Sequence, residues 1–182
     1  MATKPAEDAR PLLILAQDEG RFGRISRPKA CWAPPGIRPQ APAQVIREAS
    51  YACAAVAPSL GRICSLLLPT VNTESMNIFL QHVSQTFSDY FLVMQVDQAG
   101  WHQAKELVIP DTLRLIKQPP YSPEVNPVEH IWDDIREKSF HNRAFDSLDA
   151  LTEKLCDAFN SLSNDPDHIT SMTFFPHLNV VV

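Results

Sequence analysis

The chain has 182 residues, of which 45% are hydrophobic and 20% are charged, and its formal net charge is −5. This length allows one well-buried domain, and the acidic balance argues against a protein that binds DNA mainly by neutralising phosphates. No apolar run approaches the roughly 20 residues that cross a bilayer, and the N-terminus lacks the apolar core of a secretory signal. We therefore expect a cytoplasmic protein with no membrane partner.

The first predicted strand is PLLILAQDE, residues 11–19, a short apolar run that ends in two acids. The segment 20–43 is rich in arginine and proline, and we expect a loop or an irregular hairpin because proline breaks helices and central strands. Residues 21–39 carry basic side chains and no acid, which indicates either a solvated loop or an arm that contacts phosphates. The candidate DNA-binding residues are Arg21, Arg24, Arg27, Lys29, Trp32 and Arg38.

Two further strands are expected at 45–58 and 62–69, so that the first three strands form an antiparallel meander. An amphipathic helix is expected at 73–87, with Asn72 or Thr73 as its N-cap. The apolar run 91–97 predicts a strand, 101–108 a short helix and 113–119 another strand. Because strands and helices alternate here, we expect an α/β arrangement with parallel pairing.

The last third is predicted to be helical. Asn126 is a good N-cap, Pro127 suits the first helical position, and the apolar stripe consists of Val128, Ile131, Trp132 and Ile135. A second helix is expected at about 147–162, and Asp165-Pro166 ends it. We expect one domain over 11–163, an N-terminal tail at 1–10 and a C-terminal tail at 164–182. For the apolar end of that tail, residues 174–182, three alternatives stay open: a strand that docks on the domain, a dimer contact, or a frayed end.

Three acids occupy matching positions in this arrangement. Asp18 and Asp97 each follow an apolar strand, and Glu129 lies in the first turn of the helix after the strand at 113–119. Ligands bind at the carboxyl ends of parallel strands. Converging carboxylates repel one another unless cations hold them, so the trio is best explained by hard divalent ions with oxygen ligands. Two such ions would activate a water or hydroxyl at a phosphodiester and stabilise the leaving oxygen.

Each acid also has a purely structural explanation. Glu129 is placed to complete a capping box with the N-cap amide, and Asp97 is placed to cap the helix near Trp101. Asp18 is then a loop-start acid, or Glu19 is the functional neighbour, since adjacent strand residues face opposite sides. The accessory candidates are Glu19, His102, Asn126 and Asp133.

Two of these accessory candidates have open roles. His102 is either a surface histidine or a group near the metals. Asp133 lies one helical turn beyond Glu129 on the same helix face and is the alternative candidate for the third acid. The prolines of 119–127 restrict the path into the following helix, because each fixes its own φ and biases its predecessor to extended geometry. We expect this rigid segment to hold Glu129 where a metal ion needs it.

The motifs DE (18–19), VDQAGWH (96–102) and PPYSPEVNPVEHIWDDIREK (119–138) resemble the catalytic domain of DDE superfamily endonucleases, in the branch of bacterial insertion-sequence transposases related to mariner elements. The resemblance covers roughly residues 12–145. It implies an RNase H-like fold, a five-stranded mixed sheet whose first three strands are antiparallel, flanked by helices. It also implies that Asp18, Asp97 and Glu129 are catalytic and bind two Mg²⁺ or Mn²⁺ ions. Such enzymes nick DNA at element ends and use the freed 3′-hydroxyl to attack target DNA.

The resemblance also bears on partners. Such transposases usually carry helix-turn-helix modules ahead of the catalytic domain, and here the first strand begins near residue 11, which leaves no room for one. We therefore expect DNA as the partner, a homodimer because transposition joins paired ends, and a separate DNA-binding polypeptide. Two alternatives stay open: an inactive or repurposed remnant that serves dimerisation or protein binding, and another RNase H-like nuclease. The three intact acids favour the active domain.

Overall fold

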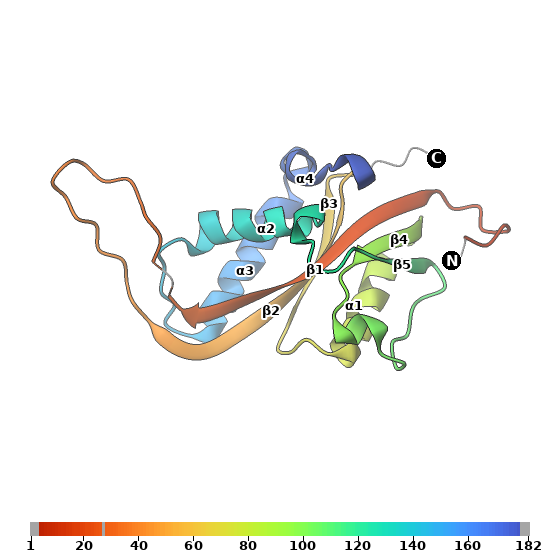
Figure 1. The fold of residues 1–182 in the computed structure, drawn as a ribbon, viewed down its shortest axis with the longest axis horizontal. Coiled ribbons are helices and arrows are strands. Elements are labelled where there is room, and N and C mark those ends of the chain that lie inside the picture. Colours follow the sequence, from red (N-terminus) through yellow and green to blue (C-terminus); the bar gives the residue numbers. More distant parts are fainter. Residues whose placement is uncertain (1–3, 27, 179–182) are drawn as a thin grey trace.

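A mixed five-stranded sheet organises the chain, of which the computed structural model describes residues 4–26 and 28–178 (Figure 1). The strands are β1 (Leu12–Ile25), β2 (Val45–Ala57), β3 (Arg62–Leu68), β4 (Phe91–Val96) and β5 (Leu113–Lys117), in the order β3-β2-β1-β4-β5. β1, β2 and β3 pair antiparallel, whereas β4 pairs parallel with both β1 and β5. The predicted α/β class, with an antiparallel meander followed by parallel strands, is confirmed.

β1 is longer than the sequence predicts. Its first part pairs with β4, and its second part continues with β2 as a two-stranded ribbon that reaches Ile25 opposite Val45. Residues 20–25, expected in a loop or an irregular hairpin, therefore belong to a strand, because pairing with β2 outweighs their mixed composition. The connection over residues 28–44 projects from the body as an arm (Figure 1).

Helices cover both faces of the sheet. α1 (Thr73–Thr86) packs on one face, and α2 (Val128–Ile135), α3 (Leu148–Ser163) and α4 (Pro166–Thr173) pack on the other. Along β2, Ala52, Ala54 and Val56 face the three-helix layer, whereas Cys53, Ala55 and Ala57 face α1. This alternation is the two-residue period of a strand. Along the described ranges, no helix is both long and apolar enough to cross a bilayer.

α1 and α3 begin at side-chain caps, whereas α2 begins one residue later than predicted, with Pro127 and not Asn126 as its N-cap. The Asn72 side chain accepts the Ser75 N–H at the start of α1, and Ser147 does the same for Ala150 in α3. The predicted stripe of α2 is buried, and one π-helical turn, Arg136–Phe140, continues this helix.

The prediction of a helix at 101–108 is wrong. Only a single 3-10 turn, Gly100–Gln103, forms there. The Asn77 side chain of α1 accepts the Val108 N–H at 2.8 Å and donates to the Glu106 carbonyl at 3.1 Å. These two bonds satisfy the backbone in an irregular path, so tertiary contact replaces the helical ladder.

The segment expected to be a C-terminal tail belongs to the fold. Asp165 and Pro166, which follow α3, also begin α4: the Asp165 side chain accepts the His168 N–H at 3.1 Å, and proline suits the first helical position. Ile169 of α4 is fully buried in the core under the three-helix layer. A short turn, Pro176–Leu178, follows, and the remaining part of the expected apolar end, 179–182, lies outside the described residues.

Candidate active site

The three predicted acids line one open cavity of about 510 Å³. Asp18 belongs to β1, Asp97 directly follows β4, and Glu129 lies in the first turn of α2. β1 and β4 pair in parallel up to Ala16 and Gln95, so Asp18 and Asp97, each two residues further along, lie together at one edge of the parallel part of the sheet. Residues 118–123, which also line the cavity, lead from β5 to this edge. Three side chains that are distant in the chain thus share one cavity.

Asp18 is held by a tryptophan of α2. The indole Nε1–H of Trp132 donates a 2.8 Å hydrogen bond to Asp18 Oδ2. Gly20 leaves room for this ring, since a Cβ there would lie 3.0 Å from it. Burial raises the pKa of Asp18 to about 7; the Trp132 hydrogen bond opposes this rise, and the negative charge of Glu129 adds to it. A poorly solvated carboxyl beside a second one favours a cation as its partner.

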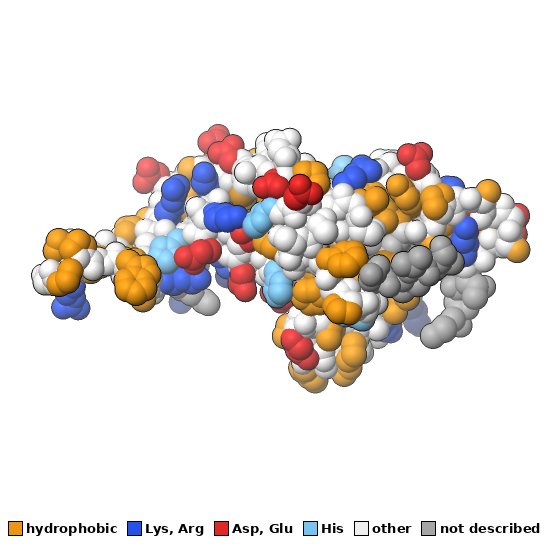
Figure 2. Space-filling view, turned by 90° about the horizontal axis from the view of Figure 1, so that it is seen from above, with side chains coloured by type: hydrophobic (Ala, Val, Ile, Leu, Met, Phe, Trp, Pro, Cys, Tyr) orange, Lys and Arg blue, Asp and Glu red, His pale blue; other side chains and the backbone are white. Residues whose placement is uncertain are grey.

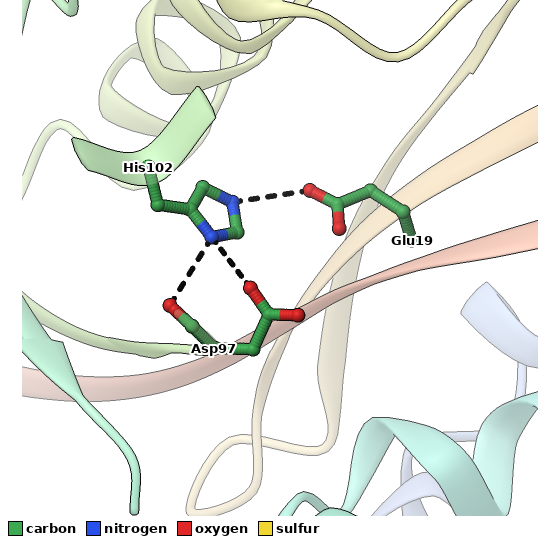
Figure 3. A group of neighbouring side chains, drawn as sticks. All are labelled: Glu19, Asp97 and His102. Carbon is green, nitrogen blue, oxygen red and sulfur yellow. Dashed lines mark hydrogen bonds and ion pairs between the residues drawn. The ribbon is translucent and has the colours of Figure 1, made fainter. Parts of the chain in front are cut away.

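Asp97 is fixed through one of its two oxygens. The Ala99 N–H donates to Oδ1 at 2.8 Å, and Nδ1 of His102 lies 2.8 Å from the same oxygen (Figure 3). Within the part of the chain that the structure describes, Oδ2 accepts no hydrogen bond. One oxygen is therefore held in place, while the other is available to a ligand in the cavity.

His102 is a buried bridge between two carboxylates and not a surface histidine. Its side chain is 1% exposed, and Nε2 lies 3.1 Å from Glu19 Oε1 while Nδ1 faces Asp97 (Figure 3). Burial disfavours the charged ring, but hydrogen bonding and the negative charges of Glu19 and Asp97 outweigh burial and raise the pKa of His102. An imidazolium donates from both nitrogens, so it satisfies both carboxylates at once.

Glu19 cannot substitute for Asp18. Its Oε1 also accepts hydrogen bonds from Gln17 Nε2 at 2.9 Å and Trp101 Nε1 at 3.3 Å. Neighbouring strand residues point to opposite faces, so Asp18 reaches α2 whereas Glu19 reaches the 3-10 turn at 100–103. The choice between the two acids, which the sequence left open, follows from these contacts.

Glu19, Asp97 and His102 offer ligand atoms that all lie within 4.8 Å of one another. A single ion takes only one ring nitrogen of a histidine, whereas here the two nitrogens face different carboxylates. We therefore interpret this group as a bridge that orients Asp97. Over the described ranges, the ligand atoms of the predicted trio Asp18, Asp97 and Glu129 do not all lie within that distance of one another. Such a wider spacing is expected for carboxylates that repel one another.

Asn126 ties the start of α2 to β1. Its side chain accepts the Val128 N–H and donates to the Gln17 carbonyl, both at 3.1 Å. The backbone N–H of Asn126 donates to the Pro123 carbonyl, so the expected capping box with Glu129 does not form. This leaves the Glu129 carboxylate to the cavity that it lines. Asp133, its expected substitute, is exposed and does not line the cavity.

The predicted DNA-binding residues separate into two groups. Arg24 is buried and donates to Glu48 and to the carbonyls of Phe145 and Asp146, so it anchors the loop before α3 instead of offering its charge to DNA. The exposed members are Arg21, Lys29, Trp32 and Arg38, and Arg27 lies outside the described residues. Figure 2 shows apolar and basic side chains together at the end of the projecting arm.

Two positioning residues escaped the sequence reasoning. Trp132 was assigned to the apolar stripe alone, although a buried indole N–H needs an acceptor and this need was a usable signal. The contact of Trp101 with Glu19 joins positions far apart in the chain, and no local pattern announces it.

The comparisons with known proteins agree with this fold. A family model described as DDE superfamily endonuclease matches residues 14–152. The chain belongs to this family, and its fold is RNase H-like. Uncharacterized protein y4pE/y4sA of Sinorhizobium fredii is 37% identical over 124 residues, which are 68% of this chain and 92% of that relative.

Solved structures of Mos1 transposase share the fold. A Mos1 paired-end complex with the left transposon end aligns with a TM-score of 0.60 at 17% identity, and covers 87% of this chain and 54% of the Mos1 chain. A Mos1 mariner paired-end complex with Mn gives 0.62 at 18% identity, with coverages of 88% and 53%. The chain thus spans about half the length of the solved chains that it matches.

Proposed function

We propose that this chain is the catalytic domain of a transposase that cleaves DNA strands at insertion-sequence ends and transfers them to target DNA. The observation that carries this proposal is the cavity shared by Asp18, Asp97 and Glu129 in a DDE superfamily member. Their oxygens are the ligands that Mg²⁺ and Mn²⁺ prefer, and we assign two such ions to this trio. When bound, the ions supply an activated water or hydroxyl and stabilise the leaving oxygen.

The surrounding residues prepare these carboxylates for that role. Trp132 holds Oδ2 of Asp18 and thereby limits rotation of the carboxylate. His102 and the Ala99 amide hold Oδ1 of Asp97, so that Oδ2 is the donor offered to the cavity. Outer hydrogen bonds of this kind orient metal ligands and lower the cost of assembling the site.

DNA is the partner that this activity requires. We assign its backbone contacts to the exposed Arg21, Lys29 and Arg38, with Trp32 as an exposed ring for stacking. We further propose that the chain acts as a homodimer, because paired ends are joined, and that a separate DNA-binding polypeptide recognises the element ends. The solved Mos1 relatives are paired-end complexes, one of them with a transposon end.

Nicking of supercoiled plasmid tests the catalytic proposal. Purified chain with Mn²⁺ or Mg²⁺ is expected to nick the plasmid, EDTA to abolish nicking, and Asp97→Asn to reduce it at least a hundredfold. Asp133→Asn is the matched control: it neutralises an exposed acid on the helix of Glu129, and we expect it to leave nicking within about twofold.

Nicking by wild type no faster than by folded Asp97→Asn would contradict the proposal and favour a repurposed remnant of the family. Metal-dependent cleavage that prefers branched DNA or an RNA hybrid over linear element ends would instead favour a different RNase H-like nuclease.

A further inference from the structure

Tyr121 has an unusual backbone conformation at the rim of the cavity. Its φ is +56°, and within the described ranges only Asn142 is another non-glycine residue with positive φ. Tyrosine is disfavoured in this left-handed region, where its Cβ crowds the backbone, while asparagine tolerates it better. The side chain of Tyr121 is fully exposed. The fold therefore bears a local strain at Tyr121 without burying its ring.

Neighbouring residues hold this conformation in place. Pro119 and Pro120 precede the tyrosine, and the Ser122 hydroxyl donates to the Pro120 carbonyl at 3.2 Å. On one side, Gln98 donates to the Gln118 carbonyl at 3.0 Å, and on the other side a 3-10 turn, Pro123–Val125, begins. Strained residues that are fixed by their surroundings and serve no packing purpose cluster at ligand sites.

The position of the ring indicates the ligand. Tyr121 lines the same cavity as Asp18, Asp97 and Glu129, and Pro119, Pro120 and Pro123 also line it. A DNA strand whose phosphodiester enters this cavity carries its bases past the rim. An exposed tyrosine ring stacks on the face of a base, but only if that base is unpaired or terminal, because the faces within a duplex are covered.

We propose that Tyr121 is a substrate-binding residue that stacks on an unpaired or terminal base beside the phosphodiester in the cavity. This inference rests on the proposed DNA-cleaving function, and it adds a preference that the acids do not supply. DNA with a short single-stranded end next to the reacting position is expected to bind more tightly than the same duplex with a blunt end.

The test separates binding from cleavage. Fluorescence anisotropy in Ca²⁺ compares a labelled duplex carrying a three-nucleotide overhang with its blunt counterpart, for wild type, Tyr121→Phe and Tyr121→Gly. We expect Tyr121→Phe to keep the preference for the overhang and Tyr121→Gly to lose roughly tenfold in affinity for it. The melting temperature of Tyr121→Gly should equal or exceed that of wild type, because glycine relieves the strain.

A purely structural role predicts the opposite pattern, namely a lower melting temperature for Tyr121→Gly and equal loss on both DNAs, and that result would overturn the inference. Phe174→Ala, which removes an exposed ring that does not line the cavity, is the control and should leave the preference unchanged. Plasmid nicking by wild type together with unchanged binding by Tyr121→Gly would refute the inference alone. Tyrosine-dependent binding without nicking would refute the catalytic function alone, and absence of DNA binding would refute both.

Discussion

Asp18 and Asp97 share a design at the scale of single residues: a buried side chain holds one carboxylate oxygen of each, and both residues line the cavity. Trp132 holds Asp18 from α2, and His102 holds Asp97 from the turn after β4. A carboxylate held at one oxygen keeps its second oxygen in a defined direction. The acids thus owe their geometry to donors that are themselves buried and fixed.

Trp132→Phe tests this design, because phenylalanine keeps an aromatic ring but removes the N–H that Asp18 accepts. We expect the Mn²⁺ concentration for half-maximal nicking to rise roughly tenfold. The free energy of unfolding should fall by about 1–2 kcal/mol, since the smaller ring leaves a cavity. Titration of nicking against Mn²⁺, beside thermal unfolding, measures both effects.

Phe159→Leu is the matched control for this variant. The Phe159 ring packs edge-on against Trp132 with centroids 6.2 Å apart, and its loss weakens the same core without removing the hydrogen bond to Asp18. An equal shift of the Mn²⁺ dependence in both variants would mean that packing, and not the indole N–H, controls the site.

At the scale of elements, α4 closes the fold by docking on the turn between β2 and β3. Gly61 occupies this turn with a φ of +57°, and a Cβ there would lie 2.2 Å from the Pro166 carbonyl oxygen at the start of α4. The Thr170 hydroxyl of α4 donates to the Pro58 carbonyl in the same turn at 3.2 Å. The glycine is required both for its backbone conformation and for the approach of the helix.

Gly61→Ala is expected to lower the free energy of unfolding by at least roughly 2 kcal/mol, through backbone strain and displacement of α4. Gly36→Ala is the comparison, because Gly36 also has a positive φ, +80°, but nothing lies within 4 Å of the added Cβ. Urea unfolding of both variants separates the clash from the strain. Equal losses would show that α4 does not press on the turn.

The whole molecule consists of a packed body and an arm that extends from it. Contacts of the arm with the body lie near its two ends: the Lys29 backbone exchanges two hydrogen bonds with the Asn142 side chain, and Lys29 Nζ lies 3.6 Å from Glu137. The Gln44 side chain exchanges two hydrogen bonds with the Phe145 backbone. At its base, the Ser26 N–H donates to the Gln44 carbonyl at 2.8 Å, so the ribbon is still paired where the arm begins. We therefore expect stability and the proposed DNA contact to be separable in this part of the chain.

Replacing residues 28–43 with Asn-Gly, which closes the Ser26–Gln44 pair through the three-residue loop Arg27-Asn-Gly with glycine at its last position, tests that separation. The melting temperature should stay within a few degrees, whereas DNA affinity should fall and its salt dependence should become shallower by about 2, because Lys29 and Arg38 are removed. Anisotropy across a NaCl series measures the slope. Lys105→Ala/Lys154→Ala removes two charges elsewhere, and the same change of slope in that variant would contradict a specific role for the arm.

Local patterns predicted those parts of the fold that depend on neighbouring residues. The apolar runs predicted the five strands, and the α2 stripe predicted the buried face of that helix, because period and capping act within a few residues. Local patterns failed where contacts between residues far apart in the chain determined the structure. Asn77 replaced the expected helix at 101–108, and packing on the core made a helix of residues expected as a tail.

The sequence by itself determined the α/β class, the family and the three acids to consider, since strand ends and motif residues are visible in a linear chain. Only the tertiary structure decided that Asp18 and not Glu19 faces the cavity, that Arg24 is buried, and that Trp132 and His102 hold the acids. The physical reason is that a hydrogen bond is specified by two partners. When those partners lie on different elements, no local pattern contains both.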